Sequence, residues 1–304
     1  MILLTGATGT VGRALLPLLL EGGHEVRALV RDPRRLGRHR VEVRITLGDL
    51  AGLGDRHQQR QALRGVDTVI HLAAAIRDQP HAPVEEVTGL ATARLLRAAE
   101  ASGVERFVFF SALNASAFQR TRFFRAKALA EEAVAASPLR TTVFAPSIVY
   151  DRDDPWVTLT RRLALLPVLP IAGSGKARYQ PIWAGDVARC VSASLDGASG
   201  KGSSDRFELA GPETLTYEQI SRLIARAAGR NRPVIHVPLG LVHRGLTWLR
   251  RIAGEAVFAT WEEAELMEVP MTTPRGTEDA TRLGVEPRRM ADVLGARLES
   301  ESPG

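Results

Sequence analysis

The chain has 304 residues, 45% of them hydrophobic, which is enough for a full core and a smaller second lobe. Its formal net charge of +6 comes mostly from arginines scattered along the sequence, which argues against nucleic-acid binding, because that function needs one concentrated basic patch. The single cysteine, Cys190, excludes an intrachain disulfide and offers no metal cluster. Since the chain opens on a strand pattern without a signal peptide, and no apolar run is long enough to span a bilayer, we expect a cytoplasmic protein.

The opening segment, MILLTGATGTVGRALLPLLLEGG, has the pattern of a strand, a glycine-rich turn and a helix. Glycines at this spacing let the backbone approach a pyrophosphate, which then sits on the free N–H groups and positive dipole of the helix N-terminus. The alternative is a small-residue turn that only packs a helix on a strand. We expect dinucleotide binding, with the following loop residues at the cofactor: Gly6, Thr8, Gly9, Thr10, Val11 and Gly12.

The end of the second strand predicts which dinucleotide binds. An acidic side chain at the strand tip would bond the adenosine ribose and repel a 2′-phosphate, whereas an arginine accommodates that phosphate. Here Arg31 follows a valine at the tip, with Arg34 and Arg35 close behind. Asp32 could face the ribose and favour NAD, but it precedes a proline and fits a turn-organising role better. We therefore expect NADP (NADPH), with NAD as the less favoured alternative.

Strand and helix patterns alternate through the first half of the chain. We expect strands at 2–5, 25–30, 41–46, 67–72, 105–110 and 140–145, and helices near 11–22, 55–64, 84–102 and 123–136. This order predicts an α/β fold with a doubly wound parallel (Rossmann) sheet. The alternation fails near residue 150. We expect a dinucleotide-binding domain over 1–150 and a smaller, mostly helical substrate or partner lobe over 151–304, with some return of the chain to the Rossmann core.

The second half carries weaker signals. An amphipathic helix is expected at 217–229, capped by Thr214 or Thr216, and SSDRFELAG predicts a short strand. A basic amphipathic helix at 238–254 could contact an anionic membrane or a protein partner, although packing into the lobe is the simpler interpretation. Asp186 precedes an apolar helical run, and we expect it to cap that helix rather than to act in catalysis.

Two more segments follow strands at the edge where a cofactor would lie. In GDL, Asp49 could bond the adenine amine or cap a turn, and Leu50 follows it. HLAAA ends the fourth strand with small residues, among them Ala73 and Ala74, which allow the chain to pass close beside a cofactor. His71 is interpreted as a packed strand histidine.

In order along the chain, TGATGTVG, VRD, GDL, HLAA, SALNAS, FxxxK, APSIVY, LPVLPIAGSGKARYQPIWAGDVA and ELAGPETLTYEQI resemble the motifs of atypical, extended-type short-chain dehydrogenase/reductases. The resemblance covers roughly residues 1–295 and is strongest to the bacterial branch similar to the NADPH-binding 39-kDa accessory subunit of respiratory complex I. Each motif is short, but their order makes the set specific.

The resemblance implies roles for individual residues. Ser111 would face the reacting carbonyl. Ala145 and Asp151 depart from the family, in which Arg and Gly are common on the substrate side of this loop. The implied cofactor contacts are Gly6, Gly9 and Gly12 at the phosphates, Arg31 at the 2′-phosphate, Asp49 and Leu50 at the adenine, Lys127 at the nicotinamide ribose, and Pro146, Ser147 and Ile148 at the carboxamide.

Phe123 occupies the position of the catalytic tyrosine in the family's Tyr-x-x-x-Lys dyad, and a phenyl ring has no proton to give. In an ordinary member the tyrosine protonates the carbonyl oxygen, the lysine lowers the pKa of the tyrosine, and the serine bonds the developing oxyanion. Losing a general acid lowers a rate by roughly 10²- to 10⁴-fold. Lys127, Tyr150, Tyr179 or a water could supply the proton instead.

Each substitute has a structural alternative. Tyr150 could pack under the second lobe, and Lys127 could be a surface lysine paired with Glu131 one helical turn away. The catalytic candidates are Ser111, Lys127 and Tyr150. The functions that fit are an NADPH-dependent oxidoreductase on a small, largely apolar carbonyl compound, a non-catalytic NADPH-binding or redox-sensing protein that serves a partner, and a nucleotide-sugar epimerase or dehydratase. No sequence feature identifies the substrate or the oligomeric state.

Overall fold

The computed structural model describes the chain except for residues 50–55, 80–81, 196–203, 239, 242–264 and 296–304. The described chain divides into two compact units, and each is treated by itself. Unit 1 consists of Met1–Pro146, Ala184–Leu209 and Glu278–Glu286. Unit 2 consists of Ser147–Trp183, Ala210–Thr277 and Pro287–Gly304. The return of the chain to the cofactor domain therefore takes place in two segments, 184–209 and 278–286.

Unit 1 is built on a parallel sheet, to which seven strands of the described chain contribute. Their spatial order is β11-β6-β5-β4-β1-β2-β3, and every neighbouring pair is parallel. Apolar runs such as RFVFF of β5 are buried along their whole length, as expected for a sheet covered on both faces. The strands are β1 Ile2–Thr5, β2 Val26–Val30, β3 Arg44–Leu47, β4 Thr68–His71, β5 Arg106–Phe110, β6 Arg140–Pro146 and β11 Ser204–Leu209.

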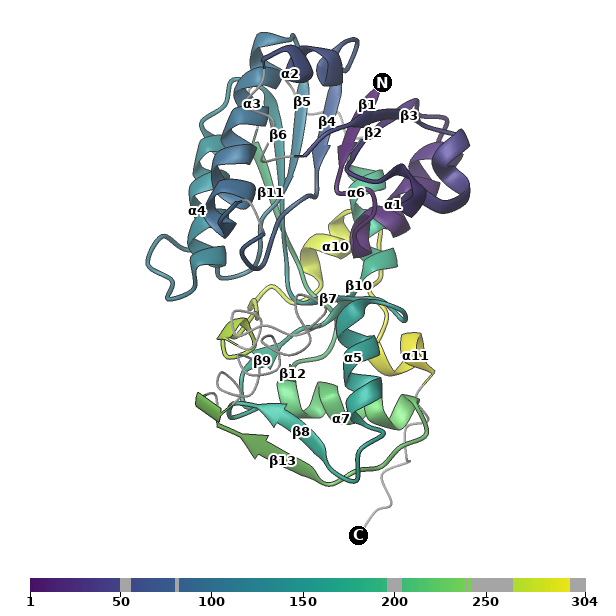
Figure 1. The fold of residues 1–304 in the computed structure, drawn as a ribbon, viewed down its shortest axis with the longest axis vertical. Coiled ribbons are helices and arrows are strands. Elements are labelled where there is room, and N and C mark those ends of the chain that lie inside the picture. Colours follow the sequence, from purple (N-terminus) through teal and green to yellow (C-terminus); the bar gives the residue numbers. More distant parts are fainter. Residues whose placement is uncertain (50–55, 80–81, 196–203, 239, 242–264, 296–304) are drawn as a thin grey trace. The chain divides into compact units, whose positions relative to one another are not determined.

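Helices cover both faces of this sheet, which confirms the predicted doubly wound fold. Figure 1 shows α1 (Thr10–Glu21) and α6 (Ala184–Leu195) on one side, and α2 (Arg56–Leu63), α3 (Ala91–Ala101) and α4 (Arg122–Ala135) on the other. A 3₁₀ segment, η1 (Pro33–Val41), follows β2. A π-helical turn, η2 (Glu86–Leu90), leads into α3, and the short α10 (Glu278–Arg282) packs on β11.

The strand order places a topological switch point at β1, which lies between β4 and β2. The chain leaves β1 toward β2 and β3 and then returns to β4 on the other side. In open parallel sheets ligands bind outside the carboxyl ends of the strands at such a point. The residues that follow β1, β2, β4 and β5 are Gly6, Arg31, Leu72 and Ser111, so the predicted cofactor and catalytic positions share one edge of one sheet.

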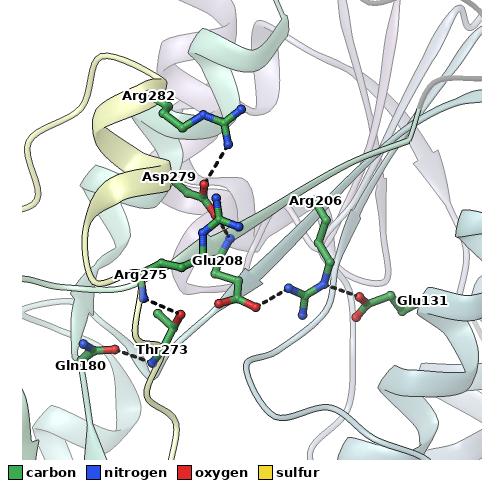
Figure 2. Close-up of polar contacts among 8 residues, drawn as sticks. All are labelled: Glu131, Gln180, Arg206, Glu208, Thr273, Arg275, Asp279 and Arg282. Atoms are coloured by element: carbon green, nitrogen blue, oxygen red, sulfur yellow. Dashed lines mark hydrogen bonds and ion pairs between the residues drawn. The ribbon is translucent and has the colours of Figure 1, made fainter.

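The edge strand β11 is tied to unit 1 by charged side chains. Arg206 of β11 bonds Glu131 of α4 at 2.6 Å and also pairs with Glu208 (Figure 2). The buried carboxylate of Asp279 in α10 accepts a bond from the Glu208 backbone N–H at 2.9 Å and pairs with Arg282 at 3.1 Å. The strand expected in SSDRFELAG is thus part of the main sheet.

Unit 2 has its own core, in which Tyr150, Tyr179 and Ile220 are fully buried. Thr216 caps α7 through a complete capping box with Gln219, which decides between the two expected caps. The expected helix at 238–254 lies almost wholly outside the described residues. The elements of unit 2 are β7 Val149–Tyr150, α5 Pro155–Leu163, β8 Leu169–Ala172, β9 Arg178–Tyr179, β10 Ile182–Trp183, β12 Leu215–Thr216, α7 Tyr217–Ala227, β13 Val234–Val237 and α11 Met290–Leu294.

Candidate functional site

The glycine-rich loop between β1 and α1 contains two glycines that the fold itself requires. Gly6 has φ +74°, and a Cβ placed there would lie 2.7 Å from the backbone nitrogen of Ala73. Gly12 is buried, and a Cβ there would lie 2.2 Å from the carbonyl oxygen of Gly6. Both glycines let the loop pack closely on its neighbours. This agrees with the alternative in which the small residues of the motif serve to pack a helix on a strand.

Gly9 differs from these two glycines. It is exposed at the N-cap of α1 with φ −80°, which any residue can adopt, and the only described atom within 4 Å of an added Cβ is the Gly6 carbonyl oxygen at 3.3 Å. Thr10, Val11 and Gly12 form the first turn of α1, whose N–H groups have no partner within the helix. The loop is therefore exposed at Gly9 and presents the N–H groups of this first turn, an arrangement that suits a phosphate group.

At the tip of β2, where a 2′-phosphate contact is predicted, Arg31 and Asp32 have different surroundings. Arg31 is exposed and makes no hydrogen bond or ion pair with any described residue. Asp32 accepts a bond from the Arg34 backbone N–H at 3.0 Å and caps the 3₁₀ segment. The carboxylate therefore organises the turn, as predicted from the following proline.

Other predicted cofactor residues lie at or beyond the same strand ends. Asp49 is exposed after β3, whereas Leu50 lies outside the described residues. Ala73 and Ala74 follow β4, and Ala74 is exposed. Pro146 ends β6 in unit 1; Ser147 and Ile148 begin unit 2, where the Ser147 hydroxyl donates to the carbonyl of Met271 at 2.7 Å.

The centre of the predicted catalytic group is Lys127, which is 3% exposed. Its Nζ donates to the Phe110 carbonyl oxygen and lies 4.9 Å from the ring centroid of Phe109 and 5.9 Å from that of Phe123. The alternative of a surface lysine paired with Glu131 is wrong, because Glu131 instead bonds Arg206 across to β11 (Figure 2). Phe109, which sequence reasoning did not single out, supplies the second aromatic neighbour of the amine.

Burial changes the proton affinity of this amine. Loss of solvation lowers the pKa of Lys127 to about 7, and the negative charge of Glu131 only partly opposes that effect. Ser111 directly follows the carbonyl that Lys127 bonds, and its Oγ is buried without a hydrogen-bond partner among the described residues. The amine therefore bonds the backbone of the residue that precedes an unused hydroxyl, and a titratable amine and a hydroxyl are groups that suit proton transfer to a bound oxygen.

Three polar residues considered from the sequence are buried within their own units. Tyr150 is fully buried in the core of unit 2, which favours its packing role, and Tyr179 donates to the Met267 carbonyl at 2.6 Å in the same unit. The expectation that Asp186 caps α6 is wrong: the helix starts at Ala184, directly after β10. Asp186 is therefore the third residue of the helix, fully buried and paired with Arg189.

His71, at the end of β4, is fully buried, and its ring nitrogens bond Thr5 at 2.7 Å and Thr92 at 2.9 Å. This confirms a packed strand histidine. The two threonine partners of His71 could not be predicted from the sequence. A threonine in a strand or helix carries no local pattern that indicates which side chain its hydroxyl will bond.

Comparisons with known proteins identify relatives of this chain. Subunit 9 of the NADH dehydrogenase (ubiquinone) 1 alpha subcomplex of Arabidopsis thaliana, a mitochondrial protein, is 28% identical over 229 residues, 72% of this chain and 56% of that protein. The (4-alkanoyl-5-oxo-2,5-dihydrofuran-3-yl)methyl phosphate reductase of Streptomyces griseus is 30% identical, covering 76% of this chain and 74% of the relative. No helix among the described residues of this chain has the length and apolarity needed to cross a membrane.

The fold has close structural counterparts. The UDP-glucose 4-epimerase of Thermus thermophilus, in complex with NAD, superposes with a TM-score of 0.71 at 20% identity, covering 97% of this chain and 96% of the enzyme. At that identity the likeness concerns the fold alone. A family model described as NAD(P)H-binding matches residues 6–196, which include the glycine loop, Ser111 and Lys127. The chain therefore belongs to the NAD(P)H-binding family.

Proposed function

We propose that this protein is an NADP(H)-dependent oxidoreductase that reduces a carbonyl group on a small, largely apolar substrate, with Lys127 as the proton donor in place of the missing tyrosine. One observation carries the proposal. The buried amine of Lys127 lies 4.9 Å and 5.9 Å from two aromatic ring centroids, has its pKa lowered to about 7, and bonds the carbonyl of the residue that precedes Ser111. The Ser111 hydroxyl has no hydrogen-bond partner among the described residues.

The lowered pKa gives Lys127 the property that the tyrosine hydroxyl would have supplied. An amine with a pKa near 7 is divided about equally between its two protonation states at neutral pH, so it can release a proton and regain it. A lysine at its ordinary pKa of 10.5 would hold the proton too tightly. Phe123 supports this role, because its ring lies near Nζ and helps to keep water away from the amine.

Ser111 is the second polar group of the proposed site. Its backbone N–H is fixed by a 2.7 Å bond to the Phe144 carbonyl, which holds the residue at the end of β5. The hydroxyl can then donate to an oxygen on which negative charge develops, while Lys127 delivers the proton. The protonated form of Lys127 would give one proton and become a neutral amine, and the bound cofactor would supply one hydride, which together convert a carbonyl to an alcohol.

The cofactor would be held by the glycine loop and by Arg31, and when bound it supplies the hydride. Gly9 is exposed and has no side chain at the N-cap of α1, where a pyrophosphate would meet the N–H groups of the first turn. Arg31 is an exposed cation that could contact a 2′-phosphate, and Asp32 is already engaged in its turn, which favours NADPH over NADH. The Streptomyces griseus relative bears the name of a reductase, which supports the same reaction class.

The proposal is tested by following NADPH oxidation against a panel of aldehydes, ketones and quinones. We expect measurable turnover in the wild type and a loss of roughly 10²- to 10⁴-fold in Lys127→Met, which keeps the side-chain volume but removes the amine. Lys176→Met removes an exposed lysine of unit 2 and is the matched control, expected to behave as wild type. Equal turnover in all three proteins would show that Lys127 is not the proton donor.

A second function is favoured by Phe123 and by the Arabidopsis relative, a subunit of a larger enzyme. On this alternative the protein holds NADPH without turning it over and serves a partner. Calorimetric binding of NADPH together with no oxidation by any member of the panel would favour the alternative. The partner itself would then be sought by affinity purification of the NADPH-loaded protein.

A further inference from the structure

A chain of buried side chains runs behind the glycine loop. Thr5 is the last residue of β1, His71 is the last residue of β4, and Thr92 lies in the first turn of α3. All three are at most 1% exposed. The imidazole of His71 bonds the Thr5 hydroxyl through Nδ1 at 2.7 Å and the Thr92 hydroxyl through Nε2 at 2.9 Å.

The direction of every hydrogen bond in this chain follows from its two ends. Thr92 donates its single hydroxyl proton to the Thr88 carbonyl oxygen at 2.7 Å, because a carbonyl can only accept. Towards His71, Thr92 is therefore an acceptor, and Nε2 must carry the imidazole proton. Burial holds the imidazole neutral, with a pKa lowered to about 3, so Nδ1 has no proton and accepts from the Thr5 hydroxyl.

The other end of the chain agrees with this assignment. The Ala73 backbone N–H points to Thr5 Oγ1 at 3.4 Å and can only donate, which leaves the Thr5 proton for His71. On the far side, the Thr88 hydroxyl donates to the Ala75 carbonyl at 3.0 Å and accepts from the Ala75 N–H at 3.1 Å. The backbone after β4 is thus held at Ala73 and at Ala75, and His71 links the two attachments.

The segment held in this way forms one wall of the predicted cofactor site. Gly6 lies so close to Ala73 that an added Cβ would come within 2.7 Å of the Ala73 nitrogen. A shift of Ala73 therefore moves the start of the phosphate loop. His71 also stacks on Phe109 with 6.1 Å between ring centroids, and Phe109 is the ring beside the Lys127 amine.

We propose that His71 is a positioning residue for the cofactor: in a single tautomer, it fixes the Thr5 hydroxyl and through it the spacing between the glycine loop and the segment after β4. Within this series of hydrogen bonds, the part that bears on the cofactor is the half that runs from Nδ1 through Thr5 to Ala73. The Nε2–Thr92 half anchors the imidazole to α3. This role concerns binding and does not depend on whether the protein turns the cofactor over.

The two halves can be separated by substitution. In His71→Asn the amide oxygen takes the place of Nδ1 and keeps the bond from Thr5, whereas in His71→Gln the amide reaches the Nε2 position and keeps the bond to Thr92. Thr5→Val removes the hydroxyl on the cofactor side at nearly constant volume, and Thr92→Val does so on the helix side. Thr5→Ser keeps the hydroxyl and is the conservative rescue.

The experiment measures the dissociation constants of NADPH and NADH by titration of the reduced-nicotinamide fluorescence, and the melting temperature of each protein without cofactor. We expect Thr5→Val and His71→Gln to weaken binding of the preferred dinucleotide about tenfold, as for the loss of one buried hydrogen bond. Thr92→Val, His71→Asn and Thr5→Ser should stay within about threefold of wild type, although Thr92→Val and His71→Asn also melt earlier.

Three outcomes would overturn the proposal. If the affinity losses of all variants follow their losses in melting temperature, His71 only stabilises the fold. If Thr5→Val and His71→Gln bind both dinucleotides as tightly as wild type, or if the wild type binds neither, the chain does not position a cofactor. The double variant Thr5→Val/His71→Gln is a further check: it should bind no more weakly than the weaker single variant, because both changes break the same bond.

Discussion

Replacing Lys127 with methionine removes the amine while keeping most of the buried volume, and it should change how stability depends on pH. In the folded protein the pKa of Lys127 is about 7, against 10.5 for an ordinary lysine. At pH values between these two pKa values, Lys127 binds a proton in the unfolded chain but not in the folded chain. Stability of the wild type therefore rises with pH across this window, from about 7 to 10.5.

The size of the effect follows from the shift. Each pH unit within the window contributes about 1.4 kcal/mol, and half-titration at pH 7 reduces the first unit slightly. From pH 7 to pH 9 the wild type should gain about 2 kcal/mol that Lys127→Met does not gain. Other titrating groups, such as Cys190 with its buried thiol, act equally in both proteins and cancel in the difference.

Urea unfolding at pH 7, 8 and 9, followed by circular dichroism, measures this difference directly. The lost bond to the Phe110 carbonyl lowers the stability of Lys127→Met by a similar amount at each pH, so it shifts the curve without changing its slope. Parallel stability curves for the two proteins would refute the argument, because they would mean that the lysine keeps an ordinary pKa in the folded state.

Four further single substitutions have expected outcomes. Gly9→Ala should abolish NADPH binding while melting near the wild-type temperature, whereas Gly12→Ala should lower the melting temperature as well, since its Cβ meets backbone at 2.2 Å; calorimetry and thermal melting of both variants decide. Arg31→Ala should weaken NADPH binding about tenfold and leave NADH binding unchanged. If the wild type binds NADH more tightly than NADPH, Asp32 and not Arg31 determines which dinucleotide binds. Phe123→Tyr should leave NADPH affinity intact and raise carbonyl reduction modestly; a variant with unchanged turnover would place the tyrosine hydroxyl out of reach of the reacting oxygen.

Much of unit 1 could be predicted from the sequence because its elements are local. Apolar runs and glycine turns mark β1, β4 and β5 to within a residue, and the short motifs locate the cofactor edge. The expected start of β3 was early, because residues 33–41 form a 3₁₀ segment that charged residues do not reveal. The place of β11 beside β6 could not be predicted, since a strand pattern carries no information on its neighbour.

In the candidate site too, contacts between distant parts of the sequence could not be predicted. The glycine loop and Lys127 are recognisable by spacing, but the burial of Lys127 depends on Phe109, which approaches from another element. Glu131 lies one turn from Lys127 in sequence and would pair with it on an isolated helix. It instead bonds Arg206, 75 residues away, and a partner at that separation leaves no local pattern.

The central claim, that Lys127 gives the proton, is tested most directly by the pH dependence of a single turnover. Protein saturated with NADPH is mixed with the best substrate of the carbonyl panel, and the decay of nicotinamide absorbance is recorded from pH 5.5 to 9. With the pKa of Lys127 near 7, the wild-type rate should fall as pH rises through about 7, because the amine loses the proton it must give, and Lys127→Met should be slow at every pH. A wild-type rate that is flat across this range, or a Lys127→Met rate equal to it, would contradict the account.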